Sequence, residues 1–114
     1  MEFENVPEFD KDLKRLLKLY NSLNTDIENL KQILNIFPNE RAPFSFRINN
    51  LQTATKVIKI KKIACSSLKG KGVNSGLRII YTYSSFSNTI IFIELYHKNE
   101  KANENRERIL KYLK

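Results

Sequence analysis

The first apolar stripe of the chain predicts a helix. Asn5 and Pro7 are residue types that begin helices, and the apolar side chains after them recur at helical spacing: Phe9, Leu13, Leu16, Leu17 and Tyr20. Ahead of this helix, residues 2–6 predict a short strand at the edge of a sheet.

A second apolar stripe follows closely and predicts a second helix. Residues 21–24 are polar enough for a short turn, and Thr25 with Glu28 fits a capping box. Pro38 and Pro43 end the stripe, which comprises Ile27, Leu30, Ile33, Leu34 and Phe37. Two helices joined by a short connection predict an antiparallel helical hairpin.

The pattern then changes to the alternation of β-strands. In residues 56–64, Ile58 and Ile60 point to one face while Lys59 and Lys61 point to the other. Further strands are predicted at 77–84 and 89–97, and the short polar connection between them predicts a β-hairpin. Residues 39–55 show no strong period.

The chain closes with another helical stripe. Asn103 is placed to cap a helix over residues 104–113, with Ile109, Leu110 and Leu113 on its apolar face. The predicted fold is α+β: an N-terminal helical hairpin packed on a three- to four-stranded antiparallel sheet, with a C-terminal helix. A length of 114 residues predicts a single domain over residues 1–114.

Charge is distributed unevenly along this pattern. The net charge is +8, and residues 56–114 carry thirteen basic but only four acidic side chains. Residues 56–78 carry seven basic side chains and no acidic one. Such a block favours a polyanionic partner, although a solvated surface that keeps a small protein soluble is the simpler alternative.

The composition predicts the cellular compartment of the protein and the kinds of site that it can hold. Cys65 is the single cysteine, which excludes an internal disulfide framework and suggests a reducing compartment. The acidic N-terminus does not fit a signal peptide, and no apolar run reaches membrane-spanning length. We therefore expect a soluble cytoplasmic protein. Because Cys65 and His97 lack companions at ligand spacing, no metal site and no cofactor are expected.

In the stretch SSLKGKGVNSGLRIIYTY, basic residues and glycines lie close together, mostly in a loop before a strand. Its loop holds Lys69, Lys71 and all three glycines of the chain. Glycine permits positive φ and close approach of backbone N–H groups to an anion, but the loop lacks the spacing of a P-loop and could serve turn geometry only. Arg78 lies inside the following strand and needs a partner, which is either Glu94 in a structural ion pair or a phosphate.

The last strand ends with Tyr96, His97 and Lys98. Alternation places Tyr96 and His97 on opposite faces, unless His97 already lies in the following turn. A lone histidine is more often structural, but one beside basic neighbours could act as a general acid or base. Tyr96 could instead stack on an unpaired RNA base.

The run KVIKIKKIACSSLKGKGVNSGLRIIYTYSSFSNTIIFIELYHKNEKANENRERIL resembles the sheet and last helix of RelE/ParE-superfamily toxins of bacterial type II toxin–antitoxin systems. The cues are the lysine-bearing strand, the loop before SGLRIIY, the hairpin and IIFIELYHKNEK. The resemblance implies a microbial-RNase-like fold. It also implies a metal-independent mRNA interferase that cleaves mRNA on the ribosome by attack of the 2′-OH on the scissile phosphate.

The resemblance also implies roles for individual residues. Lys59 and Lys61 match the family's strand lysines, and Arg78 matches the arginine that steadies the transition state. Tyr96 and His97 match loosely a group for proton transfer or stacking, and Lys98 or Lys101 could replace a second arginine. The remaining basic side chains are expected to bind RNA phosphates: Lys56, Lys62, Lys69, Lys71, Lys98 and Lys101.

The expected function is therefore that of a ribosome-dependent mRNA endoribonuclease toxin, whose partners are an antitoxin protein, the ribosome and mRNA. Two alternatives remain: a non-enzymatic ParE-like inhibitor of DNA gyrase, and an inactive basic RNA-binding module. Under either toxin hypothesis, an acidic or amphipathic antitoxin should cover the basic face.

Overall fold

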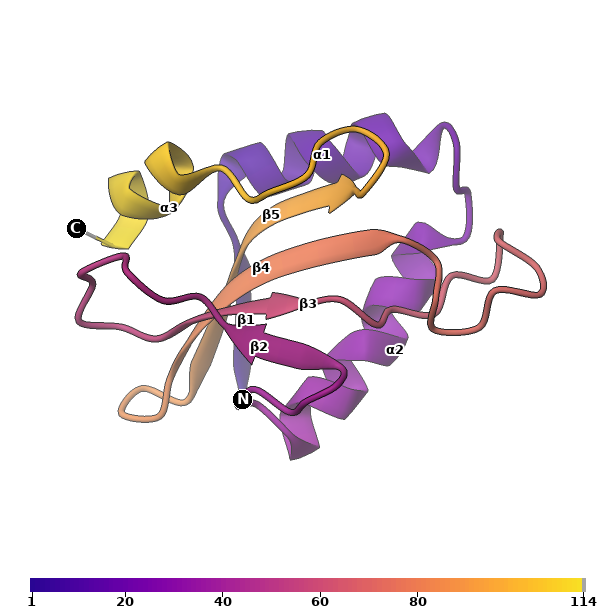
Figure 1. Cartoon of the computed structure of the whole chain (residues 1–114). Helices are drawn as coiled ribbons and strands as arrows, with labels where there is room; N and C mark the ends of the chain where they lie inside the picture. Colours follow the sequence, from indigo (N-terminus) through magenta and orange to yellow (C-terminus); the bar gives the residue numbers. More distant parts are fainter. Residues whose placement is uncertain (114) are drawn as a thin grey trace.

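A computed structural model describes residues 1–113 and shows a twisted sheet between helices (Figure 1). The elements in chain order are β1 (Glu2–Asn5), α1 (Pro7–Leu17), α2 (Leu23–Ile36), β2 (Ser45–Arg47), β3 (Val57–Ile60), β4 (Leu77–Ser84), β5 (Thr89–His97) and α3 (Arg106–Leu113). The α+β class is confirmed, and the β4–β5 hairpin has the predicted bounds.

The sheet has five strands in the order β1-β5-β4-β3-β2. β1 forms the predicted edge strand, but it pairs with β5 in parallel, whereas the other neighbours are antiparallel. The predicted antiparallel pairing is therefore confirmed for β2 to β5, but the predicted three to four strands are five, and β1 pairs in parallel. The missed strand, β2, lies within residues 39–55 and has three residues, which is too short to show a period.

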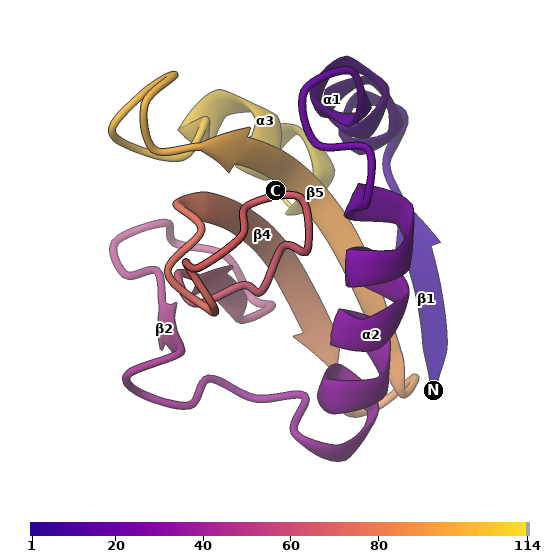
Figure 2. The same ribbon diagram turned by 90° about the vertical axis from the view of Figure 1, so that its right-hand side faces the viewer.

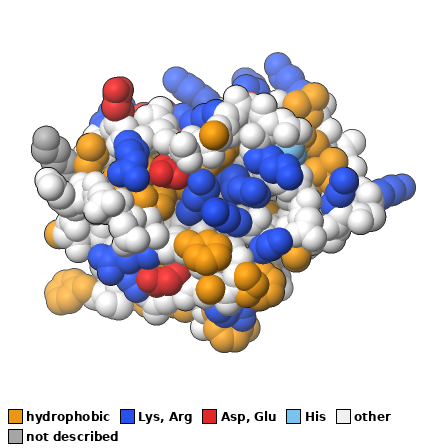
Figure 3. Space-filling view, in the orientation of Figure 1, with side chains coloured by type: hydrophobic (Ala, Val, Ile, Leu, Met, Phe, Trp, Pro, Cys, Tyr) orange, Lys and Arg blue, Asp and Glu red, His pale blue; other side chains and the backbone are white. Residues whose placement is uncertain are grey.

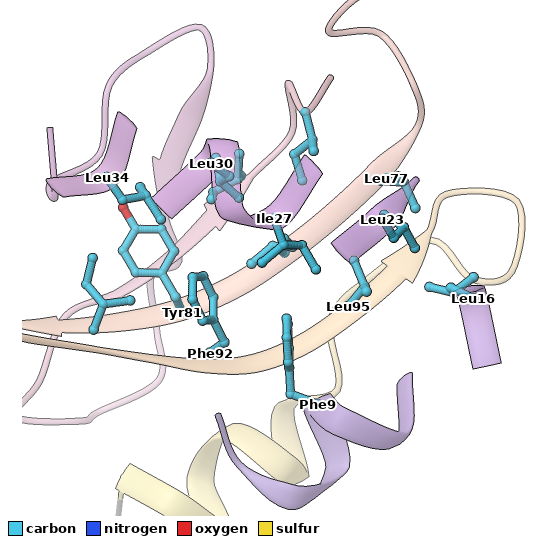
Figure 4. Packing of buried hydrophobic residues seen from close by; sticks show 14 of the residues in the cluster. Phe9, Leu16, Leu23, Ile27, Leu30, Leu34, Leu77, Tyr81, Phe92 and Leu95 are labelled. Carbon is cyan, nitrogen blue, oxygen red and sulfur yellow. The ribbon is translucent and has the colours of Figure 1, made fainter. Parts of the chain in front are cut away.

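The larger core lies between the sheet and helices α1 and α2 (Figure 4). Phe9 of α1 stacks on Phe92 of β5, with ring centroids 5.2 Å apart. Ile58 and Ile60 point into this core as the alternation predicted, and both are buried. Burial of such apolar area is the main favourable contribution to folding.

The two N-terminal helices do not form an antiparallel hairpin. Figure 2 shows α1 nearly end-on while α2 runs along the sheet. The predicted capping box is also wrong, because α2 begins at Leu23 after Ser22, and Thr25 lies inside the helix. The Ser22 hydroxyl instead donates to the Asp26 carboxylate at 2.7 Å. Both helices pack on the sheet and share its larger core, so their directions follow from contacts with the sheet as well as from the short connection.

A second, smaller core lies on the opposite face of the sheet, under α3. It consists of Leu51, Val57, Ile80, Ile93, Tyr96 and Ile109. α3 begins two residues later than predicted, because Asn105 is its cap and not Asn103: the Asn105 side-chain oxygen accepts the Arg108 N–H at 3.0 Å. The face that carries Lys59 is therefore covered in part and is not an open basic surface.

β3 is shorter than the predicted strand at 56–64. The backbone N–H groups of Lys61 and Lys62 both donate to the Phe44 carbonyl, at 2.9 and 3.2 Å, and the chain leaves the sheet there. This turn places Lys61 and Lys62 at the end of the sheet, whereas the alternation predicted Lys61 on the sheet face beside Lys59. Within residues 1–113, none of the helices is long and apolar enough to cross a membrane.

Candidate anion-binding pocket

A pocket of about 330 Å³ lies where the end of β3, the start of β4 and the end of β5 meet. Its lining consists of Pro43, Phe46, Lys61, Lys62, Asn74, Gly76, Arg78 and Lys98. Four of these side chains are cationic and none is acidic. Figure 3 shows Lys and Arg side chains gathered at the centre of one face, beside a hydrophobic group. We call this site the cationic pocket.

Arg78 is held at the pocket by backbone carbonyl groups. Its guanidinium donates to the Lys61 carbonyl at 3.0 Å and to the Leu77 carbonyl at 3.2 Å. Of the two partners that the sequence left open for Arg78, Glu94 is excluded, because Arg78 forms no ion pair with any carboxylate within residues 1–113. Glu94 instead binds the Lys101 ammonium and accepts the Asn105 N–H. The Arg78 charge is therefore positioned and left without a protein anion.

Three of the predicted phosphate-binding or catalytic lysines form ion pairs inside the protein. Lys56 contacts Glu40 at 2.8 Å, Lys59 contacts Glu104 at 3.2 Å, and Lys101 contacts Glu94. Their charges are largely compensated, which makes them weaker ligands for an external anion.

The other predicted basic residues have no ion pair within residues 1–113. They are Lys61, Lys62, Lys69, Lys71, Arg78 and Lys98. Lys69 and Lys71 are exposed in the loop before β4, and the other four line the cationic pocket. Within the pocket, the Lys62 ammonium donates to the Asn74 side-chain oxygen at 2.6 Å, which orients it without neutralising it.

Tyr96, and not His97, shares the sheet face with Lys59, and both lie beneath the segment that leads into α3. The Lys59 ammonium lies 5.8 Å from the centroid of the Tyr96 ring. Burial opposes the charged form of Lys59, but the Tyr96 oxygen and the Glu104 carboxylate outweigh it and raise the pKa of Lys59. Lys59 therefore remains protonated.

Tyr96 is covered in this structure. The residue is 1% exposed, and its hydroxyl has no hydrogen-bond partner among the described residues. Burial raises the pKa of Tyr96, an effect that the neighbouring Lys59 partly offsets. A ring covered in this way has no free face for an RNA base.

His97 is fixed by the backbone on both ring nitrogens. Its Nδ1 accepts the Asn99 N–H at 3.1 Å, so its Nε2 carries the proton that is donated to the Ser75 carbonyl at 2.9 Å. The ring also stacks on Tyr20, with centroids 5.9 Å apart. This geometry gives His97 a structural role behind the pocket, on the face opposite Tyr96.

His97 in turn explains why glycine occupies position 76. Gly76 has φ +87°, and a Cβ added there would lie 2.6 Å from His97 Nε2. The Ser75 hydroxyl donates to the Ile63 carbonyl at 2.6 Å and accepts the Leu77 N–H at 3.2 Å. These contacts fix the end of the glycine-containing loop against His97 of β5 and against Ile63, which follows β3, and so form one wall of the cationic pocket.

Phe46 is the residue at the pocket that sequence reasoning missed. It lies in β2 and is 40% exposed, and its ring centroid is 5.3 Å from the Lys61 ammonium. A strand of three residues in a segment without a period gave no signal for it. The register of β2 with β3, which pairs Phe46 with Lys59, brings it to the pocket.

The chemistry available in the pocket is electrostatic. It offers one guanidinium and three ammonium groups, but neither a carboxylate nor an imidazole lines it. Within residues 1–113, His, Cys, Asp and Glu side chains form no group of three that could hold a metal ion. The arrangement suits a phosphate or another oxyanion, which a guanidinium can bind in bidentate fashion.

Comparison with known proteins supports the fold. No protein-family model matches this chain, and no curated protein matches it by sequence. Among solved structures, the chain is similar to the solution structure of a conserved hypothetical protein, HP0892, from Helicobacter pylori. The TM-score is 0.50 and the identity 21%, over 88% of this chain and 97% of the other. At this identity, the likeness shows the arrangement of elements alone.

Proposed function

We propose that the protein is the toxin of a type II toxin–antitoxin system and cleaves mRNA on the ribosome without a metal ion. The observation that carries the proposal is the cationic pocket, whose lining includes an Arg78 guanidinium with no carboxylate partner within residues 1–113. The order of helices and strands also agrees with the fold that the resemblance to the RelE/ParE superfamily implies.

In this proposal, the pocket binds the scissile phosphate and stabilises its transition state. The 2′-oxygen forms a bond to phosphorus, the bond to the 5′-oxygen breaks, and a 2′,3′-cyclic phosphate results. Negative charge increases on the phosphoryl oxygens during attack, and Arg78 with Lys61 stabilises it. The lysine ammonium groups of the pocket are the proton donors available to the leaving 5′-oxygen. The proton of the 2′-OH leaves to a base supplied by the ribosome or solvent, because the pocket lining offers none.

Replacement of Arg78 tests the proposal. Loss of one preorganised donor to a developing oxyanion typically lowers kcat by about 100- to 1000-fold. We expect Arg78→Ala to abolish growth inhibition and to remove the cleavage sites that primer extension detects on ribosome-bound mRNA. Lys14→Ala, which removes an exposed cation from α1, is the matched charge control and should behave like the parent. Cleavage by Arg78→Ala at the parental rate would refute the role of the pocket.

A second function, non-enzymatic inhibition of DNA gyrase, is favoured by a different observation. Tyr96 is covered and His97 is hydrogen-bonded at both nitrogens, so two of the residues expected to take part in proton transfer lie outside the pocket. Growth inhibition with intact mRNA and inhibited supercoiling by gyrase would establish this function instead. Salt-dependent RNA binding without either activity would indicate a basic RNA-binding module.

An antitoxin partner follows from either toxin function. An apolar groove of about 200 Å³ lies beside the cationic pocket, between α2 and the loop before β4. The exposed side chains Ile33, Phe37 and Phe44 contribute to it. Apolar and cationic surfaces side by side suit an acidic, amphipathic segment. A small acidic protein encoded in the adjacent reading frame, and its co-purification with this chain, would support this assignment.

A further inference from the structure

The cationic pocket combines cations with an exposed aromatic ring. Phe46 is a large apolar side chain that remains 40% exposed although it lies in the sheet. Its ring is near Lys61, whose carbonyl accepts the hydrogen bond from Arg78. Ring, ammonium and guanidinium therefore form one continuous surface in the pocket. A simple phosphate site would need only the two cations, so the ring requires a separate explanation.

We propose that Phe46 is the stacking platform for a nucleobase of single-stranded RNA, next to the phosphate that Arg78 and Lys61 bind. Proteins that bind single strands join a cationic groove for the backbone with aromatic rings on which bases stack. The proposal rests on the proposed function for the choice of RNA, and it adds the residue that contacts a base.

The position of Phe46 supports this role over that of Tyr96, the aromatic residue that the sequence suggested. Tyr96 is covered by the segment before α3, whereas Phe46 lies in the edge strand β2 and lines the pocket itself. With 40% of the residue exposed, the Phe46 ring is accessible to a flat ligand. Pro43, which lines the same pocket, adds a rigid apolar surface next to it.

A binding experiment with two probes isolates the stacking contribution. One probe is a short oligoribonucleotide with 2′-O-methyl groups, which cannot be cleaved, and the other is its abasic counterpart of equal length and charge. Phe46→Ile keeps an apolar, strand-forming side chain but removes the aromatic face. We expect it to weaken binding of the first probe about 5- to 100-fold and to leave binding of the abasic probe unchanged.

Three comparisons make the experiment decisive. Phe46→Tyr should bind both probes like the parent, because it keeps an aromatic ring at this position. Phe86→Ile, which changes the fully exposed aromatic residue at the tip of the β4–β5 hairpin, should bind both probes like the parent. The slope of the logarithm of the binding constant against the logarithm of the salt concentration should be unchanged in Phe46→Ile. In Arg78→Ala this slope should be shallower by about 0.7, because one cation is lost.

Two outcomes would overturn the proposal. Equal loss for both probes would mean that Phe46 supports the pocket only structurally, and no loss would mean that the ring does not contact a base. Because the probes are not cleaved and no ribosome is present, these outcomes are distinct from a failure of the proposed function. That failure would appear as intact mRNA in the primer-extension assay.

Discussion

Replacement of Gly76 by alanine tests how the wall of the cationic pocket is held. Gly76 has φ +87°, a conformation that costs an L-residue about 1–2 kcal/mol. The new Cβ would also lie 2.6 Å from His97 Nε2 and 2.9 Å from its Cε1, so the ring must move. Moving the ring weakens the hydrogen bond to the Ser75 carbonyl, worth about 1 kcal/mol, and the stacking on Tyr20, worth about 0.5–1 kcal/mol.

We therefore expect Gly76→Ala to lower the free energy of unfolding by about 2–4 kcal/mol, measured by urea denaturation. Gly70→Ala is the matched control, because Gly70 has φ +78° and nothing within 4 Å of an added Cβ. It should show the conformational cost alone, about 1–2 kcal/mol. In a His97→Ala background, Gly76→Ala should cost no more than Gly70→Ala does, because the obstructing ring is gone.

The reasoning is refuted if Gly76→Ala and Gly70→Ala destabilise the protein equally, or if the effects of Gly76→Ala and His97→Ala simply add. Either result would mean that the His97 ring does not define the backbone conformation at Gly76. Binding of an oligoribonucleotide provides a second measurement, because a displaced pocket wall should weaken it in Gly76→Ala and leave it unchanged in Gly70→Ala.

Two further predictions concern buried charges. Asp12→Ala should lower the free energy of unfolding by about 3–5 kcal/mol in urea, because buried Asp12 accepts hydrogen bonds from the Leu95 N–H and the Arg108 guanidinium. Its loss leaves the half-buried Arg108 guanidinium without its carboxylate partner. A loss below about 1 kcal/mol would contradict this. Burial would raise the pKa of Glu104, but its own backbone N–H and Lys59 outweigh burial and lower it from 4.5. The carboxylate therefore contributes stability that is present above pH 4.5 and lost as pH falls through its lowered folded pKa. We expect Glu104→Gln to flatten the decline of unfolding free energy below pH 4.5; an unchanged pH profile would contradict the role of this pair.

Periodic patterns explain which parts of the fold could be predicted. The β4–β5 hairpin was predicted with its observed bounds because long apolar strands ending in polar residues leave one favourable register. The edge strand β1 was also predicted, but its parallel pairing depends on how α1 returns the chain over the sheet. β2 was missed, because three residues are too few to show a period.

The candidate site likewise has features that the sequence predicted and features that only the folded chain decided. The sequence indicated that the basic side chains between Lys56 and Arg78 would bind an anion, but it could not separate the paired lysines from the unpaired ones. The carboxylates of Glu40, Glu94 and Glu104 decide that separation, and each reaches its lysine only through the folded chain. Glu94, one of the two partners that the sequence left open for Arg78, is excluded for this reason, because the segment after β5 brings Lys101 to Glu94.

The sequence by itself determined the helices, the main hairpin and the excess of positive charge in the second half of the chain, because these depend on residue type and local spacing. The tertiary structure alone decided which four cations meet without an ion-pair partner within residues 1–113, that His97 contacts Gly76, and that Phe46 lines the same pocket as Arg78. These features depend on contacts between residues far apart in the chain, and local preferences do not specify such contacts. Coulomb energy falls with distance, so a charge becomes a binding group or half of an ion pair according to its neighbours in space.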